Sequence, residues 1–346
     1  MEGRFSIALT GCGRISEKHI EAIRANPKFE LVGVCDVVES LARSAGEKHG
    51  VPWFRTQADM LKAVKPQVVT LSTPSGLHAQ HGIEAARCGA HVVVEKPIAT
   101  SLPDADRLIE ACESQGRKLF VVKLGKLYPA ARLLKTAVDK GRFGRLYLVN
   151  TTIRWQRPQS YYDEAAWRGT RHLDGGAFMN QASHYVDLIL WLAGPAESVI
   201  AKTATLARHI ETEDVGAAVL KFRSGALGVL EVNMLTYPKN LEGSVTLIGE
   251  KGTVKVGGTA LDRIEVWRFA DPDPDDRRIE EMMASPQAAY VSGHKKFFEN
   301  VADVLEGKAQ PETDGREGRK SLELIIGIYE SSREGREISL PLRNFL

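Results

Sequence analysis

The first third of the chain alternates short apolar runs with longer segments whose apolar positions recur at a helical period. The apolar runs predict strands, and the amphipathic segments between them predict helices. Strands that are apolar throughout are typical of a parallel sheet covered by helices on both faces. The expected strands are Phe5–Thr10, Glu30–Cys35, Pro66–Ser72, His91–Glu95 and Lys118–Val122. The expected helices are Ser16–Ala25, Val38–His49, Leu77–Cys88 and Leu102–Ser114.

Right-handed crossovers between these strands give a doubly wound α/β sheet over residues 1–122. After residue 123, apolar and polar positions alternate between turns, which favours an open, mostly antiparallel sheet. We therefore predict an α/β protein of two domains, residues 1–122 and 123–346, with the last helices able to pack back on the first. The strands expected in the second domain are Arg145–Trp155, Glu197–Leu206, Asp214–Phe222, Ala226–Leu235, Gly243–Gly249 and Thr253–Val256.

Composition and charge narrow the classes of function. Of the 346 residues, 43% are apolar and 26% charged, and the net charge of +2 gives no reason to expect nucleic acid as a partner. No run of 18 apolar residues is present, so we expect no membrane span. The N-terminal residues enter a strand at once, without the layout of a signal peptide, and the four cysteines form no CxxC or zinc-type pair. We therefore expect a cytoplasmic protein with reduced thiols.

A glycine pair lies between the first expected strand and the first expected helix, in the order Gly11-x-Gly13-Arg14-Ile15. Gly11 permits a tight turn, and Gly13 lets the backbone approach a pyrophosphate at the helix N-terminus. Asp36 ends the second strand, where its carboxylate can accept hydrogen bonds from an adenosine ribose and would repel a 2′-phosphate. The pattern predicts a Rossmann domain that binds NAD rather than NADP. A glycine turn in another kind of βαβ protein is the alternative.

Two further groups of residues follow strands at the carboxyl edge of the expected sheet, where such sheets bind ligands. The first group consists of Ser72, Thr73, Pro74 and His78 and could line a nicotinamide ribose, with a plain turn as the alternative. The second group consists of Glu95 and Lys96. Lys96 could bond a reacting hydroxyl oxygen and share its proton, and a cationic nicotinamide nearby would lower the pKa of this lysine. An exposed lysine at a strand end is the alternative for Lys96.

Asp174 and the glycine pair Gly175-Gly176 precede a segment, ending at Ala193, that predicts a helix with polar side chains in an apolar sequence. Asn180, His184 and Asp187 are spaced i, i+4, i+7 and would share one face, which is costly in an apolar setting unless the face is used. His184 suits acid–base work, Asp187 could orient it, and Asn180 could hold a substrate hydroxyl. A core histidine is the alternative. A metal site would lack a third ligand, so we expect no metal.

These motifs together resemble the glucose–fructose oxidoreductase/inositol dehydrogenase/MocA family. They are Gly-x-Gly-Arg-Ile, Glu-Lys-Pro and Asp-Gly-Gly-x-x-x-Asn-x-x-x-His-x-x-Asp. The resemblance covers essentially the whole chain. It implies a Rossmann domain joined to an α/β domain whose open sheet mediates oligomers, often tetramers. It also implies that Lys96 and His184 form the catalytic pair.

A narrower resemblance connects segments starting at Trp155, Trp167, Gly175 and Leu235 with bacterial UDP-N-acetylglucosaminuronate 3-dehydrogenases. It implies oxidation of the sugar C3 hydroxyl with NAD, for O-antigen synthesis. Whether NADH is released or reoxidised in place by 2-oxoglutarate stays open. One departure is the segment Leu124-Gly125-Lys126, where the resemblance leads us to expect Gln-Asn-Arg.

A UDP-sugar acid needs cations and hydrogen-bond donors around its carboxylate and diphosphate. The expected substrate-binding residues are Lys96, Arg157, Tyr161, Arg168, Asn180, His184 and Lys239. Further expected cofactor-binding residues are Lys123, Trp167 and Arg168. Solvated surface is the alternative for each cation. A dehydrogenase of a free sugar or inositol, and a non-catalytic NAD-binding regulator, remain alternative functions.

Overall fold

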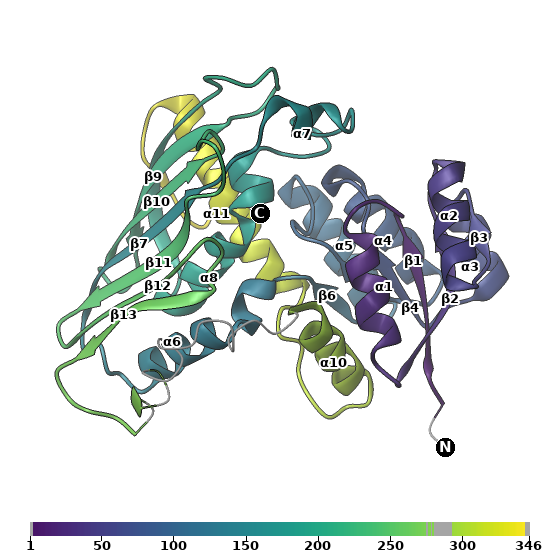
Figure 1. Cartoon of the computed structure of the whole chain (residues 1–346), viewed down its shortest axis with the longest axis horizontal. Coiled ribbons are helices and arrows are strands. Elements are labelled where there is room, and N and C mark those ends of the chain that lie inside the picture. The colour runs from purple at the N-terminus through teal and green to yellow at the C-terminus, as the bar shows by residue number, and fades with distance from the viewer. Residues whose placement is uncertain (1–2, 275, 278, 280–292, 343–346) are drawn as a thin grey trace. The chain divides into compact units, whose positions relative to one another are not determined.

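The structure, a computed structural model, describes residues 3–274, 276–277, 279 and 293–342 (Figure 1). The chain forms two compact units. Unit 1 comprises Met1–Leu124 with Ser292–Arg319, and unit 2 comprises Gly125–Val291 with Lys320–Leu346. The long helix α11, Gly315–Glu334, begins in unit 1 and ends in unit 2.

Unit 1 is built on a six-stranded parallel sheet in the order β3-β2-β1-β4-β5-β6, which confirms the predicted doubly wound fold. The order reverses between β1 and β4, so the loops after these strands open at the switch point where such sheets bind ligands. The strands are β1 Phe5–Thr10, β2 Phe29–Cys35, β3 Trp53–Phe54, β4 Val68–Leu71, β5 His91–Val94 and β6 Leu119–Val121. The helices are α1 Ser16–Arg24, α2 Glu39–His49, α3 Gln57–Val64, α4 His78–Arg87, α5 Leu102–Ser114 and α10 Gly293–Leu305.

Apolar side chains on both faces hold this sheet between its helices. Ile7 and Leu9 of β1 and Val93 of β5 are fully buried. Two helices begin at hydroxyl caps: Thr56 accepts the third backbone N–H of α3, and Ser101 does the same for α5. The short β3 and α3 are the two elements of this unit that the sequence pattern did not predict.

Unit 2 contains an eight-stranded sheet in the order β13-β12-β11-β7-β10-β9-β8-β14. All neighbouring pairs are antiparallel except β7 and β10, which confirms the predicted mostly antiparallel sheet. Its strands are β7 Leu146–Arg154, β8 Ala196–Ala204, β9 Val215–Phe222, β10 Leu227–Asn233, β11 Glu242–Gly249, β12 Gly252–Gly257, β13 Arg263–Phe269 and β14 Ile338–Ser339. Its helices are α6 Pro129–Asp139, α7 Gln159–Asp163, the π-helix η3 Ala177–Gln181 and α8 Ser183–Ala193.

The two faces of this second sheet differ. Figure 1 shows α8 and the unit 2 part of α11 along one face, and the strands bury the alternate residues that point toward it. On the other face, apolar side chains from neighbouring strands remain exposed. Ile200 is paired with Val219, and Val219 with Val229, so the three lie in one row across β8, β9 and β10.

The prediction of one continuous helix from the glycine pair to Ala193 is wrong in its first part. Residues Ala177–Gln181 form a π-helix, in which the N–H of Ala182 bonds the carbonyl of Ala177 at 2.9 Å. The regular helix α8 starts only at Ser183. The segment of Asn180 and the segment of His184 therefore belong to two different helix types, and the α-helical spacing does not apply across them.

Within the described residues, no helix combines the length and the apolar character that crossing a bilayer requires.

Candidate active site

The glycine loop after β1 is a tight turn that only Gly11 can make. Gly11 has a φ of +95°, and a Cβ there would lie 2.7 Å from the backbone carbon of Ser72. The N–H of Gly11 bonds the carbonyl of Cys35 at 2.7 Å, and the Ser16 hydroxyl bonds the carbonyl of Gly13 at 2.6 Å. Gly13 itself is exposed, and a Cβ there would meet no described atom within 4 Å.

Asp36 follows β2, and its carboxylate is fixed beside this loop. One oxygen accepts the N–H of Cys12 at 2.7 Å, and the other accepts the N–H of Val38 at 2.8 Å. The side chains of Arg14 and Ile15 are exposed at the start of α1. A turn with open space at Gly13 and an oriented, half-buried carboxylate 25 residues after Gly11 fit the phosphates and ribose of NAD.

The loop after β4 lies against the same glycine turn. The Ser72 hydroxyl is buried and has no hydrogen-bond partner among the described residues, which fits a polar ligand at this edge. His78 is fully enclosed and bonds two carbonyl oxygens, that of Pro97 at 2.7 Å and that of Thr73 at 2.9 Å. Burial lowers the pKa of His78, while the two carbonyls act in the opposite direction. His78 thus connects the loop of Thr73 and Pro74 to the loop after β5.

Lys96 follows β5, and a buried network holds the residue before it. Glu95 accepts a hydrogen bond from His19 at 2.8 Å, and His294 lies 3.6 Å from the same oxygen. Its other oxygen accepts the N–H of Lys96 at 3.1 Å, and the Lys96–Pro97 peptide is cis. Burial opposes ionisation, but the histidine hydrogen bonds outweigh it and hold the pKa of Glu95 well below its usual range. Glu95 therefore anchors the strand end that presents Lys96.

The His19, Glu95 and His294 side chains also have the composition of a metal site. The Nε2 of His19 and the Oε1 of Glu95 are only 2.8 Å apart, which is a direct hydrogen bond. Two ligand atoms at ~2.0–2.1 Å from a tetrahedral zinc ion would stand roughly 3.3 Å apart. Burial lowers the pKa of His19, so its neutral ring donates Nε2–H to Glu95 and accepts from Thr70, 2.8 Å away at Nδ1. The cluster is a structural hydrogen-bond network.

In unit 2, Asn180 is tied back to the segment before the glycine pair. Its side-chain amide donates to the buried carboxylate of Asp174. The other oxygen of Asp174 accepts the N–H of Gly169 at 2.7 Å. His184 is half-buried in the first turn of α8, and Asn180 lies at the end of η3 just before it.

The expectation that Asp187 could orient His184 stays a prediction. Asp187 pairs with Lys126: the ammonium lies 3.1 Å from the carboxylate, and each side chain is only 4% exposed. Lys126 is therefore a buried structural cation, and Lys123 is buried as well. The neighbouring Gly125 packs on α8, because a Cβ there would lie 3.4 Å from the carbonyl oxygen of His184. The segment Leu124-Gly125-Lys126, which differs from the expected Gln-Asn-Arg, thus supports the helix that carries His184.

Several of the expected substrate-binding residues of unit 2 form one group, which we call the arginine–tyrosine cluster. Arg157 donates to Gln181 at 2.9 Å and lies 5.4 Å from the ring centre of Tyr161. Arg168 lies 4.2 Å from the ring centre of the same tyrosine and donates to Glu164 at 2.7 Å. The cluster consists of Arg157, Tyr161, Arg168, Gln181 and Asn240. Trp167 is half-buried beside Arg168, and Lys239 is exposed next to Asn240.

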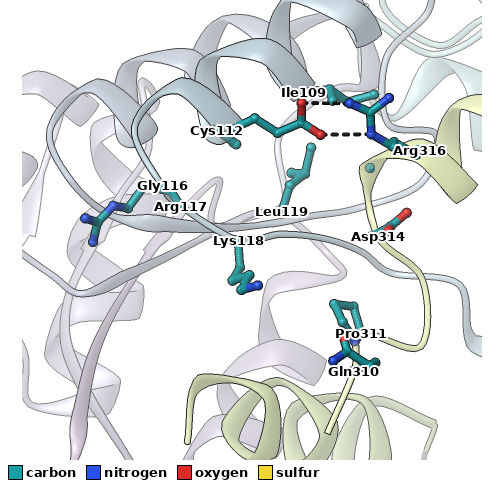
Figure 2. Close-up of a pocket in the computed structure, with 12 residues that line it drawn as sticks. Ile109, Cys112, Gly116, Arg117, Lys118, Leu119, Gln310, Pro311, Asp314 and Arg316 are labelled. Atoms are coloured by element: carbon teal, nitrogen blue, oxygen red, sulfur yellow. Dashed lines mark hydrogen bonds and ion pairs between the residues drawn. The ribbon is translucent and has the colours of Figure 1, made fainter. Parts of the chain in front are cut away.

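A separate pocket of unit 1 has a volume of about 370 Å³ (Figure 2). Leu119 on its wall is the first residue of β6, so the pocket lies at the amino edge of the parallel sheet. Figure 2 shows the ion pair between Glu113 and Arg316, 2.8 Å apart, beside it. The glycine loop and Lys96 follow strands and lie at the carboxyl edge, so this pocket is distinct from the candidate active site.

The sequence patterns did not indicate the residues that support the segments carrying the candidate site residues. His19 lies on the buried face of α1, and His294, Glu213 and Tyr329 belong to no motif. The only available signal was a polar residue at an apolar helical position, as for His19. Their partners are distant in the sequence, and no local pattern reveals them.

The comparisons with known proteins agree with this fold. Residues 5–123 match the NAD-binding Rossmann domain of the glucose–fructose oxidoreductase/inositol dehydrogenase/MocA family, and residues 135–340 match its C-terminal alpha/beta domain. The fold and site define an NAD-dependent oxidoreductase. The chain belongs to this oxidoreductase family.

Two solved structures share about half of their residues with this chain. The WlbA dehydrogenase from Bordetella pertussis, in complex with NADH and UDP-GlcNAcA, is 50% identical over 99% of both chains, with a TM-score of 0.96. The WlbA dehydrogenase from Chromobacterium violaceum, with the same two ligands, is 48% identical over 99% of this chain and 97% of its own, with a TM-score of 0.94. Among curated proteins, the D-apiose dehydrogenase of Paraburkholderia graminis is 27% identical over 97% of this chain and 90% of its own length.

Gly11 and Gly13 should respond differently to alanine. Gly11→Ala forces a Cβ against backbone at a positive φ, so we expect a lower melting temperature and lost NAD binding. Gly13→Ala meets no described atom, so the melting temperature without ligand should be unchanged. Its NAD affinity should fall about tenfold or more, a loss of ~1.4 kcal/mol, because the Cβ keeps the pyrophosphate away. Thermal unfolding and calorimetric NAD titration measure both. A Gly13→Ala protein with wild-type affinity would contradict this role.

The buried ion pair of Lys126 and Asp187 gives a stability prediction. Asp187→Asn and Lys126→Met each leave a buried charge without its partner, so unfolding in urea should become easier by about 3–5 kcal/mol. The double variant Lys126→Met/Asp187→Leu removes both charges and should lose less than either single variant. Arg316→Met breaks an exposed pair and serves as the control with little change. Equal losses in the single and double variants would show that the charges are not coupled.

Proposed function

We propose that this protein oxidises the C3 hydroxyl of UDP-N-acetylglucosaminuronate to the 3-keto sugar with NAD. The observation that supports this proposal most directly is the 50% identity, over 99% of both chains, to a dehydrogenase solved with NADH and UDP-GlcNAcA. Two features of the present chain support it. Unit 1 has the glycine turn and the Asp36 carboxylate that suit NAD, and unit 2 has the arginine–tyrosine cluster that suits an anionic substrate.

The proposed chemistry assigns the proton of the C3 hydroxyl to Lys96 and His184. NAD, when bound, accepts the hydride from the same carbon. The cationic ammonium of Lys96 would stabilise negative charge on the hydroxyl oxygen, and the imidazole of His184 is suited to take the proton near neutral pH. Glu95 keeps the Lys96 backbone in place, and the packing of Gly125 supports the first turn of α8 below His184.

The proposed binding residues divide by ligand. For the sugar nucleotide we propose Arg157, Tyr161, Arg168 and Lys239 as partners of its anionic groups, and Asn180 as a partner of a hydroxyl next to the reacting one. The Nε of Arg168 is buried without a hydrogen-bond acceptor among the described residues, which leaves this guanidinium able to bind an anion. For NAD we propose Gly11, Gly13, Arg14, Ile15, Asp36, Ser72, Thr73, Pro74, His78, Glu95, Lys96, Lys123, Trp167 and Arg168, with Glu95 and His78 acting by holding loops.

We also propose the setting of the reaction. The product would serve bacterial O-antigen synthesis in the cytoplasm, and 2-oxoglutarate would be the hydride acceptor that regenerates NAD. The free thiols of Cys12, Cys35, Cys88 and Cys112 are compatible with a reducing compartment.

A dehydrogenase of a free sugar or inositol is the second candidate. It is favoured by full-length similarity to D-apiose dehydrogenase and to the myo-inositol 2-dehydrogenase of Thermotoga maritima, which is 25% identical over 96% of this chain and 98% of its own length. Such an enzyme would need the same Lys96 and His184 but no residues that bind the UDP part of a substrate. Inhibition by UDP alone separates the two candidates.

A homo-oligomer, specifically a tetramer, is proposed from the second sheet. Ile200, Val219 and Val229 form an apolar row, each between 37% and 48% exposed, on a face that no described helix covers. A contiguous apolar surface of this kind on a broad sheet favours association with another copy of the same face.

Replacing Lys96 by Met and His184 by Ala should each lower turnover by about 10²–10⁴-fold, because each removes a proton-handling or charge-stabilising group. The measurement is absorbance of NADH at 340 nm with NAD and UDP-N-acetylglucosaminuronate, with and without 2-oxoglutarate. Turnover that needs the oxo acid would show that NADH is reoxidised in place.

Lys118→Met and His91→Ala are matched controls, because Lys118 precedes β6 and His91 begins β5, at the amino edge of the sheet and away from the carboxyl edge that presents Lys96. They should keep wild-type turnover. Near-wild-type activity of Lys96→Met or His184→Ala would remove that residue from the mechanism. Absence of any reaction together with tight NAD binding and no binding of UDP would reject the proposed substrate.

The oligomer is tested by Val219→Glu, which puts a charge at the centre of the apolar row. The wild type should have the mass of four chains of 38.0 kDa in light scattering, and the variant a smaller one, because burying the carboxylate is costly. Lys62→Glu, on exposed α3, is the control for added negative charge. A wild-type protein that runs as a single chain at micromolar concentration would reject the proposal.

A further inference from the structure

A buried carboxyl group outside the motifs lies at the start of η3. Glu213, two residues before β9, is 7% exposed. Its Oε1 accepts the N–H of Phe178 at 2.8 Å, and the N–H of Ala177 also bonds the carboxyl. These are the first N–H groups of the π-helix, which have no partner within the helix itself. The carboxyl of Glu213 therefore satisfies the beginning of the segment that carries Asn180.

The glycine pair before η3 makes room for this carboxyl. A Cβ on Gly176 would lie 2.2 Å from Oε2 of Glu213, and Gly176 has a φ of +99°. A Cβ on Gly175 would lie 2.5 Å from Cγ of Met179. The Gly-Gly motif thus allows η3 to begin directly on the Glu213 side chain.

Tyr329 of α11 completes the arrangement. Its hydroxyl oxygen lies 2.6 Å from the carbonyl of Gly175, 2.9 Å from Oε1 of Glu213 and 3.2 Å from the N–H of Met179. A tyrosine hydroxyl has one hydrogen to donate. If it donates to Gly175, the short contact with Glu213 needs a proton on the carboxyl. A neutral Glu213 then donates to Tyr329, and every polar group of the set has a partner.

The directions of the pKa shifts of Glu213 and Tyr329 agree with a protonated Glu213. Burial raises the pKa of Glu213 to about 7, and the hydrogen bonds that an ionised carboxylate would accept, that from the N–H of Phe178 first, act in the opposite direction. Burial and Glu213 also raise the pKa of Tyr329 well above its usual value. The other titratable groups nearby are Asp174, which acts on Tyr329, and Asp214. The Asp214 carboxylate is turned to the N–H groups of residues 206–208, at 2.8–2.9 Å.

We propose that Glu213 and Tyr329 are positioning residues that hold η3, and through it Asn180 and the start of the His184 helix, with Glu213 in its protonated form. This proposal rests on the proposed function for the role of Asn180 and His184. The geometric part, the holding of η3, stands on unit 2 alone. Neither residue touches the reacting atoms in this proposal.

The test compares Glu213→Gln, Glu213→Ala and Tyr329→Phe with the wild type. The amide of Glu213→Gln resembles the protonated carboxyl, so we expect wild-type turnover at pH 6. Glu213→Ala and Tyr329→Phe should lower kcat, by up to on the order of 10²-fold, as small misplacements of reacting groups do, with unchanged KM for NAD. The ratio of wild-type to Glu213→Gln kcat should fall as pH rises through about 7, because only the wild type then acquires a buried charge. A merely structural role predicts no such change in the ratio.

Two readouts do not depend on catalysis. Amide hydrogen exchange at Phe178 and Met179 should be faster in Glu213→Ala and Tyr329→Phe but not in Glu213→Gln. The folded carboxyl binds its proton more tightly than the unfolded one. The melting temperature of the wild type relative to Glu213→Gln should therefore be highest below pH 4.5 and decline up to about pH 7.

The outcomes separate the two proposals. Unchanged exchange in both truncated variants, or equal loss of kcat in Glu213→Gln and Glu213→Ala, overturns the positioning proposal. A wild type that does not turn over UDP-N-acetylglucosaminuronate while exchange behaves as expected rejects the proposed substrate. In that case the holding of η3 by Glu213 and Tyr329 is retained.

Discussion

A carboxyl group removed from water must be given hydrogen bonds or a counter-charge, and this requirement organises the proposed site. Several segments that present proposed site residues are fastened to a carboxyl group within their own unit. Glu95 fixes the backbone of Lys96, and Asp174 binds the amide of Asn180. The same relation holds for Asp36 with the glycine loop, Asp187 with Lys126, and Glu213 with η3. Because a displaced carboxyl would lose several bonds at once, these segments have little freedom to move.

How far the sequence could predict this depended on whether the signal was local. The longer strands of unit 1 were found because continuous apolar runs between amphipathic segments are a local pattern. The turn at Gly11 was found for the same reason, since its residue order specifies a backbone conformation. The elements β3 and α3 escaped because a two-residue strand and an eight-residue helix have too few positions to show a period. The π-helix escaped because a periodicity of 3.6 residues per turn does not distinguish one wider turn within a helical segment.

The partners of the buried polar residues could not be predicted from local patterns. Asp187 was expected to orient His184, three residues away, but the sequence did not indicate its ion pair with Lys126, 61 positions earlier in the chain. Glu213 and Tyr329 are separated by 116 positions and belong to no motif. Sequence spacing identifies which residues can share a helix face, but the partner of a buried charge is chosen by tertiary packing. Chemistry was therefore predicted at the level of residue type, and its supporting contacts were not.

The segment Leu124-Gly125-Lys126 shows why the supporting contacts matter for substrate choice. It differs from the expected Gln-Asn-Arg, and it lies against α8 rather than standing free. A side chain larger than glycine at position 125 would approach the His184 carbonyl at 3.4 Å, and Lys126 neutralises Asp187 one turn further along. A substitution in this segment would therefore act on the packing of the helix that carries His184. Differences in substrate preference among relatives can thus arise beneath the site as well as in it.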